Sequence, residues 1–112
     1  MAKVLVERWD QLASTAHYDA RELAKLCNLS VRQLEREFQR FLKRTPQDWL
    51  NEQRIKAALP MLLSGEQVKK VALELRFKQV SHFCRQFKLQ NRLTPSQFVS
   101  IQTGTTRVVA QR

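Results

Sequence analysis

The sequence has little of what builds β-hairpins, disulfide frameworks or metal sites. Its 112 residues include two glycines, three prolines and two cysteines. Because hairpin turns depend on glycine and proline, this scarcity favours helices over sheet. Cys27 and Cys84 lie far apart in the chain, and neither belongs to a Cys-x-x-Cys pair. We therefore expect no disulfide framework, no metal site and a reducing, cytoplasmic compartment.

Long hydrophobic runs are also missing. No apolar stretch approaches the roughly 18 residues needed to span a bilayer, and charged residues interrupt the N-terminal segment before a signal peptide could form. Export and membrane anchoring are therefore not expected. Hydrophobic residues make up 43% of the chain, with six Phe, two Trp and one Tyr, which is enough for a folded core. The length predicts one compact domain or two very small ones.

Acidic residues are absent from the last third of the chain. All ten lie between Glu7 and Glu74, and residues 1–74 contain 13 basic residues, for a net charge of +3. The last 38 residues carry seven basic residues and no acid, which accounts for the rest of the total charge of +10. Such a local excess is typical of a surface that contacts phosphates or anionic lipid, with a solubilising charge bias as the alternative.

Two helix-start signals lie close together in the first half of the chain. Asp19 with Glu22, and Ser30 with Gln33, each have the spacing of a capping box. The first predicts a short helix to about Asn28, a residue that tolerates the left-handed conformation at a helix end. The second predicts a helix with an apolar inward face, formed by Leu34, Phe38 and Phe41. Two short helices joined by about three residues have the spacing of a helix-turn-helix.

A longer helix follows. Thr45, Pro46 and Asp48 supply an N-cap, an N1 proline and an N3 acid, and Gly65 is a natural C-terminal stop. Pro60 lies inside this stretch, so we expect a kink or an early break there. Beyond the glycine another short helix is predicted, with an apolar face of Val68, Val71, Ala72 and Leu75.

An internal repeat relates the two halves of the chain. At an offset of 49 residues the halves match at these pairs: Leu34 with Phe83, Arg36 with Arg85, Phe38 with Phe87, Thr45 with Thr94, Pro46 with Pro95, and Trp49 with Phe98. Before the turn the offset is 48, so the second turn has one more residue than the first. The repeat predicts two helix-turn-helix units joined by the helix that begins at Pro46.

We therefore expect an all-α fold of about seven helices, with two helix-turn-helix subdomains joined by a long linking helix. Its expected segments are a lead-in helix (1–16), a first helix-turn-helix (17–45), a linking helix (46–64), a second helix-turn-helix with a closing helix (65–102) and a disordered tail (103–112).

If the second helix of each pair lies in a major groove, the outward residues near its N-terminus reach the bases. The outward residues are Arg32, Gln33, Glu35 and Arg36 in the first unit, and Val80, Ser81, His82, Cys84 and Arg85 in the second. Arginine can bind guanine through two hydrogen bonds, glutamine can do so with adenine, and glutamate can accept one from cytosine. Valine offers only apolar contact, for example to a thymine methyl group. The first set is thus equipped to distinguish base pairs.

Phosphate contacts are expected from nearby cations and helix N-termini: Ser30, Arg40, Lys43, Arg44, Thr45, Lys78, Lys88 and Arg92. For each lysine a solvated face is the alternative. An intact helix from Pro46 to Leu63 would measure roughly 27 Å, and successive major-groove faces repeat at about 34 Å. A rigid helix of this size could hold two recognition helices one turn of DNA apart, so that a single chain occupies a bipartite site.

Five segments occur in the following order: ARELAKLCNLSVRQLEREFQ, TPQDWLNEQRIKAALPMLLSG, VALELRF, HFCRQFK and LTPSQF. Their combination resembles the DNA-binding domain of the AraC/XylS family of bacterial transcription regulators, from about His17 to Ile101. The resemblance implies a monomeric all-α domain with two helix-turn-helix subdomains, which binds double-stranded DNA in adjacent major grooves. It also implies, as is usual in the family, activation of transcription through RNA polymerase. The base-reading positions of the family fall on Arg32, Glu35, Arg36, Val80, Ser81, His82 and Arg85.

Three residues depart from the family pattern. Arg76 stands in the second turn, where glycine is usual, which predicts a positive φ at some cost. Gln79 stands where serine or another good N-cap is usual, and Pro60 is the interior proline. All three concern the second unit or its placement, so we expect specificity to rest mainly on the first.

The family commonly joins this domain to a sensing domain that binds a small molecule or mediates dimerisation. A chain of 112 residues leaves no room for one, so we expect no effector site and no cofactor in it. It is either a stand-alone regulator or a domain of a longer protein.

Competing functions remain. An enzyme is not expected, because His17 and His82 have no convincing nucleophile or metal partner. Trp9 and Trp49 fall at inward spacing, which favours core packing over base stacking. The main alternative is a helical adaptor that docks on a protein such as RNA polymerase, and the second is a weakly specific nucleic-acid binder.

Overall fold

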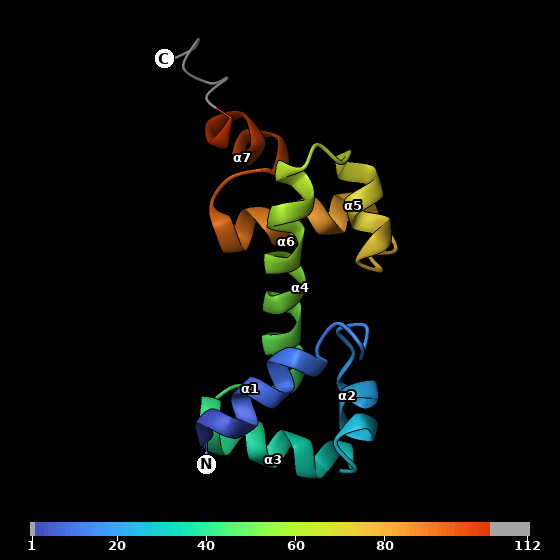
Figure 1. Ribbon diagram of the computed structural model, residues 1–112, viewed down its shortest axis with the longest axis vertical. Coiled ribbons are helices and arrows are strands. Elements are labelled where there is room, and N and C mark those ends of the chain that lie inside the picture. Colours follow the sequence, from blue (N-terminus) through green and yellow to red (C-terminus); the bar gives the residue numbers. More distant parts are fainter. Residues whose placement is uncertain (1, 104–112) are drawn as a thin grey trace. The chain divides into compact units, whose positions relative to one another are not determined.

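The computed structural model describes residues 2–103, apart from the side chains of residues 2–6. Over this range the chain forms seven α-helices and no strand (Figure 1). They are α1 (Ala2–Leu12), α2 (Ala20–Leu26), α3 (Val31–Leu42), α4 (Pro46–Leu63), α5 (Val68–Glu74), α6 (Val80–Asn91) and α7 (Pro95–Gln102). The all-α fold is therefore confirmed for the described residues. Of the tail expected to be disordered, 103–112, all but Thr103 lie outside them.

The chain divides into two compact units, Met1–Arg54 and Ile55–Arg112. The boundary falls inside α4, so this helix contributes residues to both units. The first unit contains α1, α2 and α3, and the second contains α5, α6 and α7. Each unit thus holds one pair of short helices, α2 with α3 or α5 with α6, whose members pack against each other.

The helix bounds reproduce the internal repeat. α3 and α6 are both 12 residues long and begin 49 residues apart, at Val31 and Val80. Each ends at a C-cap in the left-handed conformation, Lys43 at φ 57° and Arg92 at φ 65°. Four residues connect α2 to α3, whereas five connect α5 to α6. The additional residue expected in the second turn is thereby confirmed.

Two of the predicted helix starts form as expected. In the capping box of α3 the Ser30 hydroxyl accepts a hydrogen bond from the Gln33 N–H at 3.1 Å, and the Gln33 side-chain oxygen accepts from the Ser30 N–H at 2.8 Å. At α4 the Thr45 hydroxyl accepts from the Asp48 N–H at 3.1 Å. These bonds satisfy N–H groups that have no partner within the helix, which fixes where each helix begins.

The predicted capping box of α2 forms only in one direction. The Asp19 carboxylate accepts from two N–H groups in the first turn, but Glu22 pairs with Lys25 at 3.3 Å instead of returning to Asp19. The reason is that the Asp19 N–H already donates to the Ala16 carbonyl at 3.0 Å. With that donor occupied, Glu22 is left to pair along the exposed face of the helix.

The early break expected at Pro60 does not occur. α4 continues through Pro60 to Leu63, and Gly65, at φ 97°, ends it as expected. Proline removes one donor from the helix ladder, but its own carbonyl accepts from the Ser64 N–H at 3.0 Å, so the ladder resumes one turn later. The proline ring is exposed while Leu62 is buried, and this burial holds the last turn in place.

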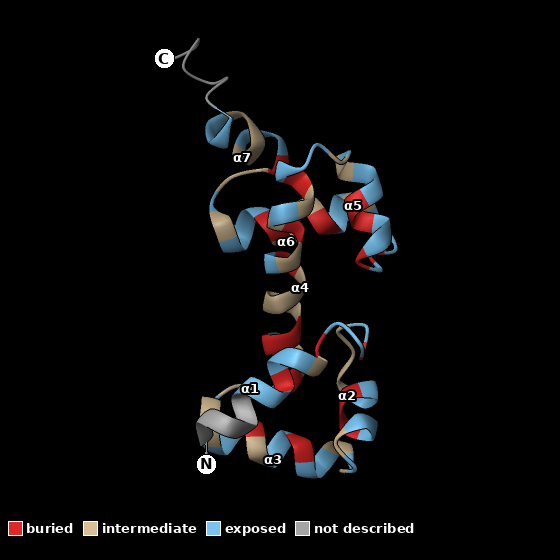
Figure 2. Cartoon of the chain, viewed as in Figure 1, coloured by how far each residue is buried: buried red, intermediate tan, exposed pale blue. Residues whose placement is uncertain are grey.

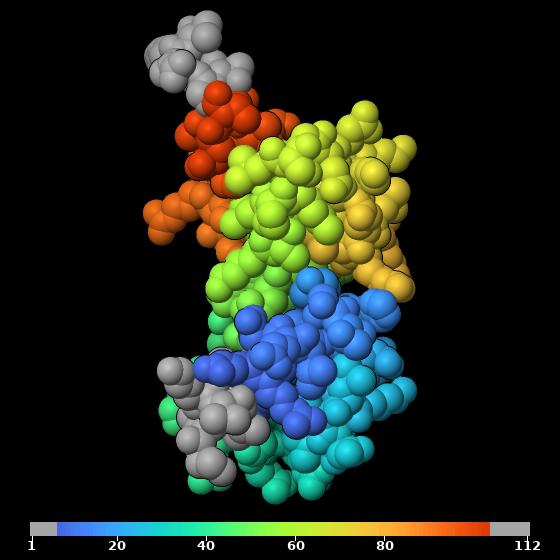
Figure 3. Space-filling view, viewed as in Figure 1, coloured from blue at the N-terminus to red at the C-terminus, as the bar shows by residue number. Residues whose placement is uncertain are grey.

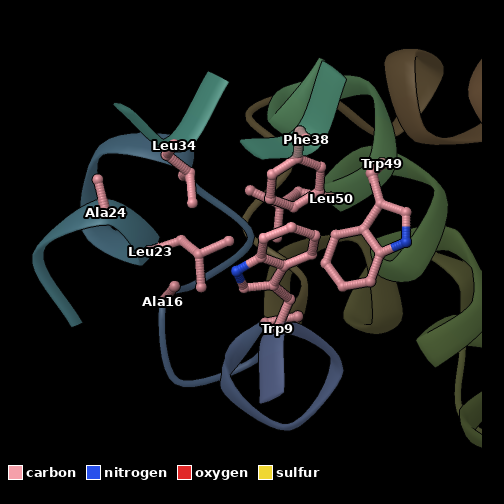
Figure 4. Close-up of a cluster of buried hydrophobic side chains, with 9 residues drawn as sticks. Trp9, Ala16, Leu23, Ala24, Leu34, Phe38, Trp49 and Leu50 are labelled. Carbon is pink, nitrogen blue, oxygen red and sulfur yellow. The ribbon is translucent and has the colours of Figure 1, made fainter. Parts of the chain in front are cut away.

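The core of the first unit is built around Trp9 (Figure 4). Its ring stacks on Phe38 with centroids 3.9 Å apart, and Phe38 meets Trp49 edge-on at 5.5 Å. Aliphatic side chains from α2, α3 and α4 complete the cluster: Leu23, Ala24, Leu34 and Leu50. The prediction that both tryptophans belong to the core is confirmed. The surfaces of α1 and α2 lie next to each other in the space-filling view (Figure 3).

The core of the second unit is a chain of phenylalanine rings. Phe83 lies 5.2 Å from Phe77 and 5.8 Å from Phe87, and Phe87 lies 5.7 Å from Phe98, measured between ring centroids. Tilted and edge-on contacts of this kind stabilise aromatic cores beyond the area that they bury. The apolar face predicted for α5 packs here too, with Val71, Ala72 and Leu75 buried.

A capping substitution tests the difference between the two units. Gln79, the N-cap of α6, makes no side-chain cap hydrogen bond, although its backbone has the extended conformation of an N-cap. Replacing it by the residue at the same repeat position, Gln79→Ser, should raise the free energy of unfolding by about 0.5–1 kcal/mol in urea denaturation followed by circular dichroism.

The matched control is Ser30→Gln, which removes the working cap of α3 and should lower the same free energy by about 1 kcal/mol. A Gln79→Ser variant with no gain in stability would show that the first turn of α6 is not limited by its cap.

Candidate nucleic-acid interface

The buried side of α3 decides which residues face outward. Leu34 and Phe38 are fully buried and stand one helical turn apart. Buried and exposed positions consequently alternate along the helix, as the red and pale blue segments of α3 show (Figure 2). All four base-reading candidates of this helix are exposed: Arg32, Gln33, Glu35 and Arg36.

Three of these four candidates line a common surface cavity of about 500 Å³. Its lining consists of Arg32, Glu35, Arg36, Gln39, Arg44 and Thr45. The structure thereby places two predicted phosphate contacts beside the predicted base contacts. Gln39 was not predicted, although its position four residues after Glu35, on the same helical face, was a usable signal. The result is a site with two arginines and one carboxylate on an exposed helix.

Gln33 differs from the other candidates. Its side-chain oxygen accepts the Ser30 N–H at 2.8 Å in the capping box, and its own N–H donates to the Ser30 hydroxyl. Bidentate binding of adenine requires both the oxygen and the amino group of the amide. Gln33 and Ser30 are therefore engaged in holding the start of α3, and the side-chain oxygen of Gln33 already accepts one hydrogen bond there.

The outward face of α6 is less uniformly polar. Ser81, His82 and Arg85 are exposed, whereas Val80 is half-buried. The His82 ring contacts the edge of Phe77, with centroids 5.4 Å apart, which restrains its orientation.

Arg85 belongs to a second surface cavity, of about 400 Å³, which it lines with Lys88, Leu89 and Arg92. Leu89 is 71% exposed and was not predicted, because an apolar residue on a basic face carries no polar signal.

The cationic side chains among the predicted phosphate contacts differ in exposure. Five of them are exposed: Arg40, Lys43, Lys78, Lys88 and Arg92. Arg44 stands apart, because its Nη1 donates to Glu52 Oε1 at 3.1 Å and both side chains are about one-third exposed. Arg40 packs over the ring of Phe41, with the guanidinium carbon 5.3 Å from the centroid. The charge of Arg44 is thus partly neutralised within the protein, whereas that of Lys43 is presented to solvent.

The turn between α5 and α6 carries the strain expected from its sequence. Arg76 has φ 68°, in the left-handed region that costs a residue with a Cβ about 1 kcal/mol or more. The corresponding residue of the first turn is Asn28, at φ 60°, a residue type that adopts this conformation more readily. Because Gln79 also supplies no side-chain cap, the start of α6 is less stabilised than the start of α3.

Among the described residues, no group of three or more His, Cys, Asp or Glu side chains is arranged to hold a metal ion. Within the same range, none of the helices combines the length and apolar character that crossing a bilayer demands.

Comparison with known proteins gives three findings. A family model described as a helix-turn-helix domain matches residues 23–100. An HTH-type transcriptional regulator from Haemophilus influenzae is 33% identical over 78 residues, which is 69% of this chain and 26% of that protein. The chain therefore spans about a quarter of the length of this curated relative.

The third finding is a crystal structure, the C-terminal domain of the two-component response regulator yesN from Fusobacterium nucleatum. It superposes with a TM-score of 0.71 at 23% identity, over 85% of this chain and 97% of that one, and so shares the fold. The family match begins in α2 and ends in α7, and thus includes both helix-turn-helix pairs. The chain belongs to the helix-turn-helix family of AraC/XylS-type transcription regulators.

Proposed function

We propose that this chain is a sequence-specific DNA-binding domain of a transcription regulator, in which α3 and α6 are the recognition helices. The observation that carries the proposal is the cavity on α3, where Arg32, Glu35 and Arg36 are presented together opposite the buried face of the helix. Membership of the family supports the same assignment. A major groove of B-DNA admits one α-helix, and base edges are then read by its outward residues.

The chemistry of α3 suits mixed base pairs. Arg32 and Arg36 can each donate two hydrogen bonds to a guanine, and Glu35 can accept one from a cytosine amino group. On α6, Arg85 can bind guanine, Ser81 and His82 can form single hydrogen bonds, and Val80 can contact a thymine methyl group.

Phosphate contacts come from the exposed cations. We assign them chiefly to Arg40, Lys43, Lys78, Lys88 and Arg92, since Arg44 is already paired with Glu52. Thr45 stands at the N-terminus of α4, where a phosphate would meet the positive end of the helix dipole.

A bipartite site follows from the repeat. Two helix-turn-helix units in one chain allow a monomer to occupy two adjacent major grooves, without the two-fold symmetry that a dimer imposes on its DNA. α4 is helical over 18 residues, roughly 27 Å at 1.5 Å per residue, and contributes residues to both units. We expect the first unit to contribute more of the specificity, because α6 begins with strain at Arg76 and without a cap at Gln79.

The regulatory role is proposed from the family. Activation of transcription through RNA polymerase is usual for AraC/XylS-type regulators, and we propose it here, with the bacterial cytoplasm as the place of action.

Binding of a duplex and a scrambled control, measured by fluorescence anisotropy at low and high salt, tests the function. The duplex is one selected by the protein from a random pool. The account predicts tighter binding to the selected duplex and weaker binding to both at high salt. Equal affinity for both would indicate a nonspecific binder, and no affinity for either would favour the protein adaptor.

Removing one arginine of α3 should impair specific binding. Arg36→Ala is expected to weaken binding to the selected duplex by about 1–3 kcal/mol and to relax the preference at one base pair, because the bidentate contact is lost. The fold should remain intact, since the side chain is exposed. Arg21→Ala, at an exposed arginine of α2 outside the cavity, is the control. An unchanged preference at every base pair would contradict the assignment of Arg36.

Removing a phosphate contact should act differently. Lys43→Ala is expected to weaken binding to all duplexes alike and to reduce the salt slope by about one unit, because one fewer counterion is released. Lysine and alanine both carry a Cβ, so the left-handed C-cap at φ 57° is retained at similar cost. The measurement is affinity against salt concentration for two unrelated duplexes. A changed base preference would contradict the assignment of Lys43 to the backbone.

A further inference from the structure

The segment between α1 and α2 has an unusual backbone. His17 and Tyr18 are consecutive residues in the left-handed region, at φ 53° and φ 56°. Neither is a glycine, so each costs about 1 kcal/mol or more and persists only where surrounding contacts hold it. The Tyr18 N–H donates to the Ala13 carbonyl at 3.0 Å. This bond holds the segment to the turn that follows α1.

The other side is held by a residue 29 positions away. Gln47, in the first turn of α4, donates from Nε2 to the Tyr18 carbonyl at 2.9 Å and accepts the Ala20 N–H on Oε1 at 3.0 Å. Nε2 also donates to Asn51 Oδ1 at 3.0 Å, one turn further along α4. These partly buried bonds engage both ends of the Gln47 side-chain amide, so the amide has one preferred orientation.

The bond to Ala20 completes the cap of α2. The Asp19 carboxylate accepts the N–H groups of the second and third helical residues, at 2.8 and 3.1 Å. The first helical N–H, that of Ala20, is the one that Gln47 takes. A helix leaves its first N–H groups without internal partners, so Asp19 and Gln47 divide the task of satisfying them.

Among the residues that the structure describes in the second unit, the matching positions do not form this arrangement. At the repeat offset of 49, Gln47 corresponds to Ser96, which is exposed. Gln67, the N-cap of α5, makes no side-chain cap hydrogen bond. We call the hydrogen bonds from Gln47 to Tyr18 and Ala20 the Gln47 clamp. This clamp belongs to the first unit, the one that carries the two-arginine face on α3.

We propose that Gln47 is a positioning residue for DNA recognition, an inference that rests on the proposed function. Its hydrogen bonds hold α2, and the strained residues His17 and Tyr18 before it, against the start of α4. Because Leu23 and Ala24 of α2 and Leu34 of α3 belong to one buried cluster, a fixed α2 fixes the outward face of α3. Gln47 touches no DNA in this account and sets the pose of Arg32, Glu35 and Arg36 through the helix pair.

The burial of Tyr18 supports a restrained segment. Burial raises the pKa of the Tyr18 hydroxyl above its ordinary value, and the nearby Arg54 guanidinium opposes that rise. Removing Gln47 would leave the Tyr18 carbonyl and the Ala20 N–H without their partner at a partly buried position, which is more costly than removing an exposed bond.

The test substitutes the residue that the second unit uses. Gln47→Ser is compared with the unmodified chain for binding to the selected duplex and to duplexes altered separately in each half-site. The half-site of the first unit is the one at which Arg36→Ala relaxes the base preference. We expect discrimination at that half-site to fall by about fivefold, with discrimination at the other half-site unchanged. Equal losses at both half-sites, or no loss at either, would overturn the inference.

Two further variants make the result specific. Gln47→Glu keeps an oxygen for the Ala20 N–H but loses the donor to the Tyr18 carbonyl. It should therefore lose less discrimination between duplexes than Gln47→Ser. It also keeps the test possible if the serine variant does not fold. Ser96→Ala, at the matched position of the second unit, should leave binding unchanged.

Hydrogen exchange of the Ala20 N–H separates this inference from the proposed function. In the free protein, Gln47→Ser should speed this exchange, whereas Gln47→Glu should preserve its protection. If the unmodified chain shows no specific DNA binding, the proposed function fails, but the exchange rate of the Ala20 N–H still tests whether Gln47 holds the start of α2. Unchanged protection of this N–H in Gln47→Ser would overturn that part of the inference.

Discussion

The arrangement of each unit depends on two large apolar side chains that stand one turn apart on the second helix of its helix-turn-helix pair. In α3 they are Leu34 and Phe38, and in α6 they are Phe83 and Phe87, all fully buried. Successive helical residues are rotated by about 100°, so a shift of two residues would place Arg36 at the buried position of Leu34 or Phe38. The burial of these pairs, which is a hydrophobic constraint, therefore determines which polar side chains are offered to a ligand.

The repeat preserves this constraint while other details of the two units have diverged. Both recognition helices have the same length and end at left-handed C-caps. The first begins with a complete capping box, whereas Gln79 supplies no cap to the second. The first turn uses Asn28 at positive φ, whereas the second uses Arg76. The chain thus keeps two similar folds but stabilises the start of one recognition helix better than the other.

Much of this was predictable from the sequence because the signals are local. Cap residues such as Ser30 and Thr45 act within one turn, and the apolar spacing of Leu34 and Phe38 acts within two. These signals correctly predicted where α3 and α4 begin and which face of α3 is buried. Of the kink or early break expected at Pro60, the break does not occur, since loss of a single donor does not outweigh burial of the following turn.

Sequence reasoning missed contacts between residues in different turns or elements, and it missed an exposed apolar residue on a basic face. The Arg44–Glu52 pair and the hydrogen bonds of Gln47 join residues in different turns or elements, and no local pattern announces them. Leu89 is exposed on a basic face and follows no helical rule.

The central claim is that both units of one chain recognise bases, and selection of bound duplexes from a random pool tests it most directly. The account predicts an asymmetric consensus in two parts, spaced by about one helical turn of DNA, with the stronger preference in the part read by the first unit. A single short consensus would contradict base recognition by α6, and a pool without enrichment would contradict sequence-specific binding altogether.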